Sequence, residues 1–220
     1  MPPILYLPYE NDPIEIIYAD ETLLVAHKPS GLLAVPGRGA EKQDCLARRV
    51  QAEYPEALIV HRLDMATSGL MLLARSKESQ RCLSLLFQER QVEKRYIAVV
   101  EGVLASPCGE INLPLIADWP NRPLQKVDFA CGKPSLTRYR QLGYDSNYNG
   151  SRLELQPETG RTHQLRVHLR ALGHPILGDA LYADVSVQAK ADRLLLHAHQ
   201  LAFAHPQHGK MMTFFCPAPF

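Results

Sequence analysis

The chain has 220 residues, of which 46% are hydrophobic and 21% charged, and its formal net charge is +1 at pH 7. This composition excludes a mainly disordered chain, because the apolar side chains suffice for the core of one large domain or two small ones. No run approaches the ~20 consecutive apolar residues of a membrane-spanning helix, and the first residues lack the positive start of a secretory signal.

The cysteines and the charges further restrict the kind of protein that this chain can be. Five cysteines lie far apart without a CxxC pair, which argues against a disulfide framework and against a thiolate zinc site. A reducing cytoplasm is therefore the expected compartment. Residues 1–27 carry five acids and no lysine or arginine, so the remaining chain is mildly basic. Mild basicity alone does not establish a nucleic-acid partner.

The first half of the chain predicts a mixture of strands and helices. Residues 1–13 are proline-rich and predict an extended arm. The elements expected after the arm follow from apolar spacing and turn residues. They are two short strands around a turn at 20–21 within 14–28, a loop at 28–37, a helix at 44–54 with Asp44 as N-cap, a strand at 58–64 that runs into a loop, a buried strand at 69–75, and a helix from 77 capped by Ser76.

The second half predicts mainly strands. Alternating polar and apolar residues indicate half-exposed strands of an antiparallel sheet at 136–142 and 151–157. The other expected elements are a strand at 94–103, a segment at 111–127 that is mainly loop, a helix that starts at Thr162 and is stopped by Gly173, and strands within 193–206 and 211–216. Strands and helices do not alternate regularly, which favours an α+β fold over a doubly wound one.

A polar cluster lies between two apolar strands in the segment HRLDMATSGL, residues 61–70. Loops at the ends of rigid strands are where proteins usually present reactive groups. Asp64 could act there as a nucleophile, a base or a metal ligand. Taken alone, the loop is better explained by an Asp64 that caps a turn and an Arg62 that pairs with a surface acid, since structural aspartates outnumber catalytic ones.

Three arginines, three histidines and no acid fall within GRTHQLRVHLRALGH, residues 160–174. On the predicted helix, His163, Arg166 and Arg170 share one face. Such a face could hold RNA phosphates and keep a nearby aspartate ionised; it could equally be a solvated basic surface. The histidines permit a metal site, but no HExxH motif is present and we do not expect a metal.

Two segments place an aromatic ring beside cations, as proteins that bind single-stranded or looped RNA do. In KRYIAVV, residues 94–100, Tyr96 follows Lys94 and Arg95. In WPNRPLQKV, residues 119–127, the single tryptophan of the chain lies among amide and cationic side chains. The ordinary explanations are that tyrosine favours strands and that a tryptophan pins a long connection to the core.

No GxGxxG or phosphate-binding loop motif is present, so no nucleotide cofactor is indicated. HRLDMATSGL, with KPSGLLAVPG before it and KRYIAVV and GRTHQLRVH after it, closely resembles the RluA-type pseudouridine synthases. The similarity continues in order through DWPNRPLQKV, GKPSLTRYRQL, GHPILGDALY and RLLLHA, and covers about residues 14–220. It is greatest toward the short members of the family that modify both 23S rRNA and a tRNA anticodon stem-loop.

The resemblance implies a cofactor-free RNA isomerase that flips its target uridine out of a stem-loop. It also implies an α+β fold with a mixed, largely antiparallel central sheet in two halves, flanked by helices, with the active cleft between the halves. Residues 14–220 would form a single catalytic domain without an S4 RNA-binding domain. The resemblance also implies that the protein is a monomer. RNA selection would then depend on the catalytic domain and its loops.

The resemblance also assigns roles to individual residues. It makes Asp64 the catalytic carboxylate, Tyr96 the ring that stacks on the target base, and Arg166 the partner of the catalytic carboxylate. Arg62 would fill the space that the flipped nucleotide leaves. The remaining expected RNA contacts are His61, Trp119, Asn121, Arg122, Lys126, Arg161 and His163.

The implied reaction breaks the N1–C1′ bond and joins C5 to C1′, so one carboxylate suffices and no group donor is consumed. Attack at C1′, addition to C6 and deprotonation at C2′ all stay open as the route of Asp64. A glycosidase-like hydrolase is the nearest chemical alternative, and it would need a second carboxylate, for which Asp179 is the best candidate. An RNA-binding protein without activity is the alternative from a different class.

Overall fold

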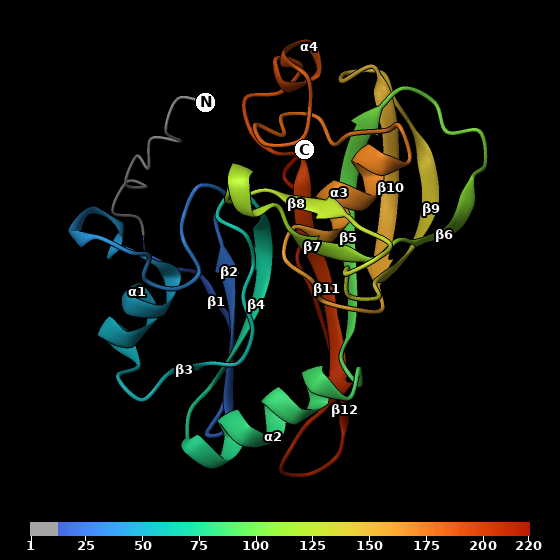
Figure 1. Cartoon of the computed structure of the whole chain (residues 1–220). Helices are drawn as coiled ribbons and strands as arrows, with labels where there is room; N and C mark the ends of the chain where they lie inside the picture. Colours follow the sequence, from blue (N-terminus) through green and yellow to red (C-terminus); the bar gives the residue numbers. More distant parts are fainter. Residues whose placement is uncertain (1–12) are drawn as a thin grey trace. The chain divides into compact units, whose positions relative to one another are not determined.

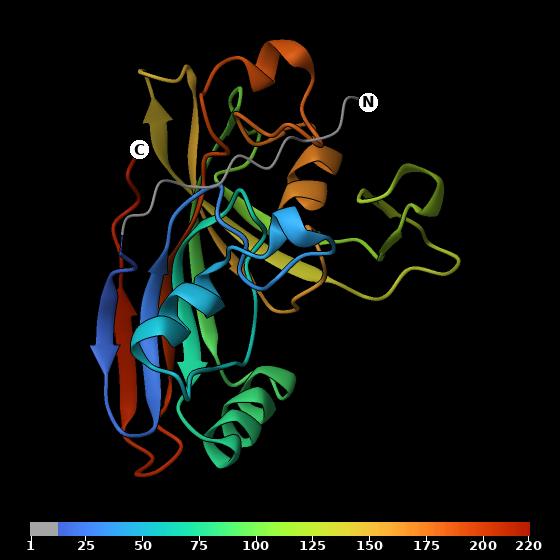
Figure 2. The same ribbon diagram turned by 90° about the vertical axis from the view of Figure 1, so that its left-hand side faces the viewer.

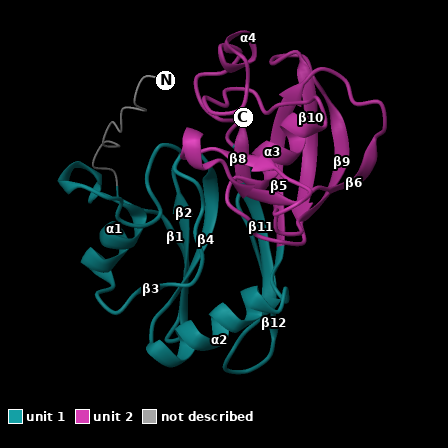
Figure 3. Cartoon of the chain, in the orientation of Figure 1, with its two compact units in different colours: residues 1–93, 198–218 teal, residues 94–197, 219–220 magenta. Residues whose placement is uncertain are grey.

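The computed structural model describes residues 13–220, so the predicted arm at 1–13 lies outside the described residues except for Pro13. The described chain forms two compact units (Figure 3). Unit 1 comprises residues 13–93 and Ala198–Ala218, and unit 2 comprises Lys94–His197 and Pro219–Phe220. Within residues 13–220, no helix is both long enough and apolar enough to cross a membrane.

Unit 1 is built on antiparallel strands (Figure 1). Strands β1, β2 and β4 pair in that order, β3 pairs with β4, and β11 pairs with β12. Every residue of β4 is buried, as its continuous apolar run predicts. The bounds of these strands are Ile16–Ala19 for β1, Leu23–Lys28 for β2, Leu58–Ile59 for β3, Ser68–Ala74 for β4, Leu196–Ala204 for β11 and Met211–Phe215 for β12.

The helices of unit 1 are η1 (Ala40–Lys42), α1 (Leu46–Glu53) and α2 (Lys77–Gln88). Helix α2 lies along β3 and β4 (Figure 2). Its buried Leu83 belongs to a hydrophobic core that includes Leu72 of β4. The predicted Ser76 cap of α2 is confirmed, because its hydroxyl accepts the backbone N–H of Ser79 at 3.0 Å.

The predicted N-cap of α1 is wrong, because the cap is Cys45 rather than Asp44. The N–H groups of Leu46 and Ala47 donate to loop carbonyls, those of Leu33 and Ala34, so the start of the helix is satisfied without a side chain. The carboxylate of Asp44 is held instead by Arg49. That hydrogen bond is the main reason why the pKa of Asp44 lies below its ordinary value.

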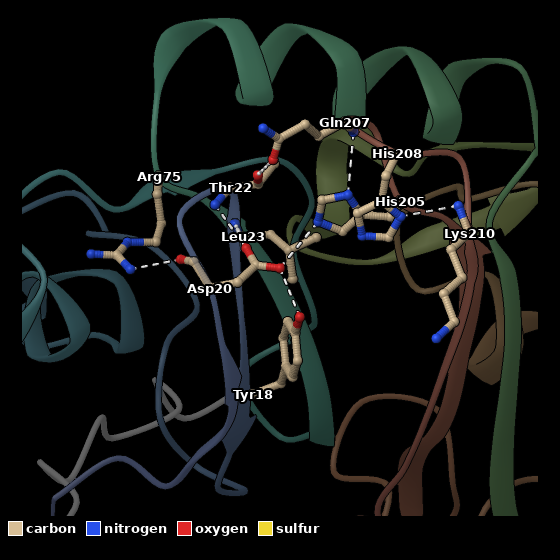
Figure 4. Close-up of polar contacts among 9 residues, drawn as sticks. All are labelled: Tyr18, Asp20, Thr22, Leu23, Arg75, His205, Gln207, His208 and Lys210. Carbon is tan, nitrogen blue, oxygen red and sulfur yellow. Dashed lines mark hydrogen bonds and ion pairs between the residues drawn. The ribbon is translucent and has the colours of Figure 1, made fainter.

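The turn between β1 and β2 is organised by Asp20 (Figure 4). One carboxylate oxygen accepts the backbone N–H groups of Thr22 and Leu23, at 2.7 and 2.9 Å. The other accepts the hydroxyl of Tyr18 at 2.8 Å and lies 3.1 Å from Nε2 of His205, which follows β11. Asp20 therefore fastens the predicted turn to the hairpin of β11 and β12.

Unit 2 contains a four-stranded antiparallel arrangement in the order β5, β10, β9, β6, and a separate two-stranded pair, β7 and β8. Together with unit 1 this is a mixed sheet in two parts with few helices, so the predicted α+β class is confirmed. The bounds are Glu93–Glu101 for β5, Cys108–Asn112 for β6, Leu115–Ala117 for β7, Gln125–Val127 for β8, Leu136–Asp145 for β9 and Gly150–Pro157 for β10; the helices are η2 (Trp119–Asn121), α3 (Gln164–Ala171) and α4 (Val185–Gln188).

The expectation that residues 111–127 are mainly loop missed two short strands, β7 and β8. β7 and β8 pair from Leu115↔Val127 to Ala117↔Gln125, and the prolines stand outside both strands. We call residues 115–127, with the η2 turn between the two strands, the β7–β8 arm. The two strands were not predicted because the prolines interrupt the alternation of polar and apolar residues that indicates a hairpin.

Helix α3 is shorter and more buried than predicted. It starts at Gln164, because His163 is its N-cap in a left-handed conformation with φ of 54°. Residues 164–169 are all buried while Arg170 is exposed, so the predicted basic face is not a solvated surface. The helix lies against β8 and β9, and its buried polar side chains therefore need partners inside unit 2.

Candidate active site

The loop that carries Asp64 lies in unit 1, between β3 and β4. Leu63, Thr67 and Ser68 are buried, Asp64 is partly exposed and Arg62 is exposed. The backbone N–H of Thr67 donates to the carbonyl of Asp64 at 3.1 Å and closes a turn. The loop thus combines a buried frame with accessible polar side chains.

His61 anchors the start of this loop. Its Nε2 accepts the backbone N–H of Leu72 in β4 at 2.9 Å, and its ring stacks on Phe87 of α2 with centroids 4.5 Å apart. An imidazole nitrogen that accepts a hydrogen bond is unprotonated at that position. His61, which was predicted as an RNA contact, therefore helps to hold the loop in position.

Lys28 anchors the same loop from the other side. It is fully buried, and its ammonium donates to the carbonyls of Pro29, Leu32 and Met65 at 2.8, 2.6 and 2.9 Å. The Met65 carbonyl also accepts the N–H of Gly31 at 2.9 Å. The sequence analysis did not identify Lys28. The available signal was its position as the last residue of an apolar strand and the first of the segment KPSG, where a lysine is expected to be buried.

Tyr96 lies in unit 2, on β5 opposite Leu155 of β10, and is partly exposed. The cation before it, Arg95, donates to Glu154 at 3.2 Å. Arg140 donates to the same carboxylate at 2.9 Å. The position of Tyr96 is therefore set by a regular strand, which orients side chains more firmly than a loop does.

Arg166 of α3 forms a buried ion pair with Asp179. The two side chains are 4% and 0% exposed, and Nε and Nη2 of the arginine lie 2.8 and 2.6 Å from the two carboxylate oxygens. Oδ1 of Asp179 also accepts the N–H groups of Leu181 and Tyr182. Sequence reasoning considered Asp179 only as a second catalytic acid and missed this pair.

Tyr182 connects three parts of unit 2. Its ring centroid is 5.1 Å from Cζ of Arg166, and its hydroxyl accepts the N–H of Gln125 in β8 at 2.8 Å. The same hydroxyl lies 2.7 Å from Nδ1 of His163. His163 and Arg166, both predicted as site residues, are therefore brought together by a tyrosine that the sequence did not single out.

The β7–β8 arm carries most of the other predicted RNA contacts. Trp119 is 63% exposed, and the guanidinium carbon of Arg122 lies 3.6 Å from its ring centroid. Asn121 donates to Asp118 at 2.9 Å, and Lys126 is exposed. The ring and the cations together offer a stacking surface beside positive charge.

The predicted site residues are divided between the units. His61, Arg62 and Asp64 lie in unit 1, and all the others lie in unit 2. Arg161 is exposed, and its Nε donates to the carbonyl of Pro134 at 3.3 Å.

Comparisons with known proteins identify the family. A family model described as RNA pseudouridylate synthase matches residues 22–171. The dual-specificity RNA pseudouridine synthase RluA of Escherichia coli K12 is 50% identical over 215 residues, 98% of each chain, and that of Yersinia pestis is 51% identical over 205 residues, 93% of this chain and 99% of the other. The solved structure of human RNA pseudouridylate synthase domain containing 1 matches with a TM-score of 0.78 at 30% identity, over 94% of this chain and 84% of that one. The chain therefore belongs to the RNA pseudouridylate synthase family, a family of RNA isomerases.

Proposed function

We propose that this enzyme converts specific uridines to pseudouridine in stem-loops of both 23S rRNA and tRNA, acting as a cytoplasmic monomer. The observation that carries the proposal is the 50% identity, over 98% of both chains, with a relative named for dual specificity. In this proposal the loops of the chain select the RNA.

Asp64 is the catalytic carboxylate in this proposal. In the isomerisation, the N1–C1′ bond breaks, the uracil turns over, C5 joins C1′, and the hydrogen of C5 is released as a proton. A carboxylate can start this sequence at C1′, at C6 or at C2′. The anchoring of its loop by Lys28 and His61 supports the assignment, because a reactive group needs a rigid frame.

Base flipping brings the uridine to Asp64. Leaving the stack costs a few kcal/mol, and least in a loop. In the proposal Tyr96 stacks on the flipped uracil, Arg62 fills the vacated space, and Arg166 pairs with the catalytic carboxylate. The regular strand under Tyr96 and the exposure of Arg62 agree with these roles.

The β7–β8 arm, with Arg161 and His163 of the α3 N-terminus, is the proposed grip on the stem-loop. Trp119 would stack on an unpaired base while Arg122 and Lys126 meet phosphates. Asn121 would supply an amide for a base edge. The arrangement of Trp119 under the Arg122 guanidinium supports this, since a preformed ring and cation lose little freedom on binding.

The geometry disfavours a glycosidase-like hydrolase. Its second carboxylate would have to be Asp179, but that side chain is fully buried. Its two oxygens accept four N–H donors, two from Arg166 and two from the backbone. A carboxylate held in this way cannot reach a sugar or activate a water.

The test uses RNA that carries tritium at C5 of uridine, as whole tRNA and as 23S rRNA fragments. The wild-type protein, the Asp64→Asn variant and the Asp192→Asn variant, which alters an exposed acid, are each incubated with both RNAs. We expect release of tritium from both RNAs with the wild type and Asp192→Asn, and none with Asp64→Asn. Release by Asp64→Asn at the wild-type rate would remove Asp64 from catalysis, and release from one RNA alone would contradict dual specificity.

A further inference from the structure

Directly after β8, residues 128–132 form a turn that we call the Asp128 turn. The N–H of Asp128 donates to the carbonyl of Pro114 at 3.0 Å, and the carbonyl of Asp128 accepts the N–H of Gly132 at 2.9 Å. Oδ1 of the same aspartate accepts the N–H groups two and three residues further along the chain, at 3.0 and 2.9 Å. Four hydrogen bonds therefore fix the backbone on both sides of Phe129.

The end of the Asp128 turn is fixed as well. Lys133 and Leu115 of β7 exchange two backbone hydrogen bonds, of 2.8 and 3.0 Å. A Cβ on Gly132 would lie 2.3 Å from the carbonyl oxygen of Asp128, so the chain passes too close to itself there for any residue but glycine. The turn is therefore an ordered support for the side chain that it carries.

That side chain is the ring of Phe129, which is 79% exposed. The apolar packing of the β7–β8 arm is made by other residues, since Leu124 and Val127 pack against a core that contains Leu115 and Val167 of α3. A ring that stays in water forgoes the stabilisation that burial would bring. A ring on an ordered support loses little freedom when it binds a ligand. Both points favour a binding role for Phe129.

The charges around the ring indicate the kind of ligand. Lys126 and Lys133, on either side of the turn, are both exposed. The pKa of Asp128 lies below its ordinary value mainly because the N–H of Cys131 donates to it, and the positive charge of Lys126 also contributes, so this ammonium lies near the turn. An aromatic ring beside cations binds a nucleobase and its phosphate, whereas an apolar protein surface would gain nothing from the cations.

We propose that Phe129 is a second base-stacking site of the enzyme, which binds an unpaired nucleobase of the RNA loop. This base is neither the target uracil nor the base stacked on Trp119. Trp119 lies beyond the end of the paired strands at Ala117, and Phe129 lies beyond the opposite end, at Val127. We therefore expect the two rings to contact different nucleotides. The inference rests on the proposed function, in which the arm grips a stem-loop.

The first experiment measures the Kd for an anticodon stem-loop RNA, together with the single-turnover rate constant at saturating RNA. Phe129→Leu keeps an apolar side chain without an aromatic face, and Phe129→Tyr keeps the face. We expect Phe129→Leu to raise the Kd about 10-fold, within the range for one lost base stack, and Phe129→Tyr to stay within about threefold of the wild type. Neither variant should change the rate constant more than about threefold, because the ring does not touch the reacting atoms. Val185→Ala, at an exposed apolar residue of the same unit, is the control and should bind as the wild type does.

Stem-loops in which one loop nucleotide at a time is replaced by an abasic residue identify the base. At the nucleotide that stacks on Phe129, loss of the base should weaken binding by the wild type about 10-fold and binding by Phe129→Leu less than about threefold. The same comparison with Trp119→Ala should identify a different nucleotide. The salt dependence of the Kd should be the same for Phe129→Leu and the wild type, since no phosphate contact is lost.

A wild-type Kd for Phe129→Leu would overturn the proposal, as would equal losses of affinity for Phe129→Leu and Phe129→Tyr. Coupling of both rings to one nucleotide, or of Phe129 to none, would overturn it as well. Tritium release by the wild type keeps the two proposals apart. If the wild type releases tritium from neither RNA, the proposed function fails; if it releases tritium and Phe129→Leu binds as the wild type does, only the second stacking site fails.

Discussion

The fully buried ammonium of Lys28 donates a 2.9 Å hydrogen bond to the carbonyl oxygen of Met65, the residue that follows Asp64. The same ammonium holds the carbonyls of Pro29 and Leu32, so one side chain joins the loop after β2 to the loop before β4. The two loops are 37 residues apart in sequence at the Lys28–Met65 contact. The position of Asp64 therefore depends on a residue from another strand.

Replacing this lysine should loosen the Asp64 loop. For Lys28→Met we expect a loss of about 2–4 kcal/mol in the free energy of unfolding, since three carbonyls lose their donor while the cost of burying an ammonium also disappears. Urea unfolding of the variant and of Lys126→Met, which alters an exposed lysine, measures the difference. An unchanged unfolding midpoint for Lys28→Met would show that the loops hold without the ammonium.

The Asp20 cluster predicts a loss of stability in acid (Figure 4). Burial alone would raise the pKa of Asp20, but hydrogen bonds from the Leu23 N–H, the Tyr18 hydroxyl, the Thr22 N–H and His205 together hold it below its ordinary value of 3.8. A lowered carboxylate pKa stabilises the folded state above the unfolded-state pKa, and this stabilisation is lost as the pH falls through the folded-state value.

The Asp20→Asn variant isolates that contribution. We expect it to be less stable than the wild type at pH 7 by about 1–3 kcal/mol, the range for hydrogen bonds to a charged group. The difference should shrink as the pH falls below about 4. Unfolding free energies measured from pH 7 to pH 2.5 test this, and a difference that stays constant with pH would contradict it.

His168 predicts a second pH dependence, nearer neutrality. Burial is the main cause that lowers its pKa below the ordinary 6.5, and its hydrogen bond with the Leu113 carbonyl opposes this. The folded state therefore favours the neutral ring. Its stabilisation is complete above about pH 6.5 and is lost as the pH falls, because the unfolded chain then binds the extra proton.

The measurement for His168 is the difference in pH dependence between two proteins. As the pH falls from 7.5 to 5.5, the urea midpoint of unfolding should decrease more steeply for the wild type than for His168→Gln. The glutamine at position 168 does not titrate in this range. Comparing slopes rather than absolute midpoints removes the contribution of the other histidines. Equal slopes would mean that the buried ring does not control stability in this range.

Trp119 and Arg122 should control RNA affinity rather than the chemical step. Loss of one stacked base costs about 1–3 kcal/mol, so Trp119→Ala should weaken RNA binding about 5- to 150-fold. Arg122→Gln should weaken binding and reduce the salt dependence by about one phosphate contact. Titrations at several salt concentrations measure both, with Val185→Ala as a control at an exposed apolar residue of the same unit. Wild-type affinity for Trp119→Ala would remove the arm from the RNA interface.

Local patterns in the sequence determined much of the fold. The apolar run at 69–75 predicted β4 within one residue, and Ser76 predicted the start of α2, because burial on both faces and capping leave marks within a few residues. The alternation at 136–142 and 151–157 likewise predicted β9 and β10. The motif HRLDMATSGL pointed to the RNA pseudouridylate synthase family, which the comparisons established.

Only the tertiary structure determined which side chains and strands from distant parts of the sequence contact each other. From the sequence, Asp179 was a candidate for a second catalytic acid, whereas the structure shows it paired with Arg166. Lys28 had no predicted role, and the structure shows its ammonium bound to the Met65 carbonyl. The arm formed by β7 and β8 appeared only through the pairing of Leu115 with Val127. Local propensity records what a residue prefers within one turn or strand, whereas these contacts depend on how distant segments pack, and burial then obliges each polar group to find the partner that packing brings.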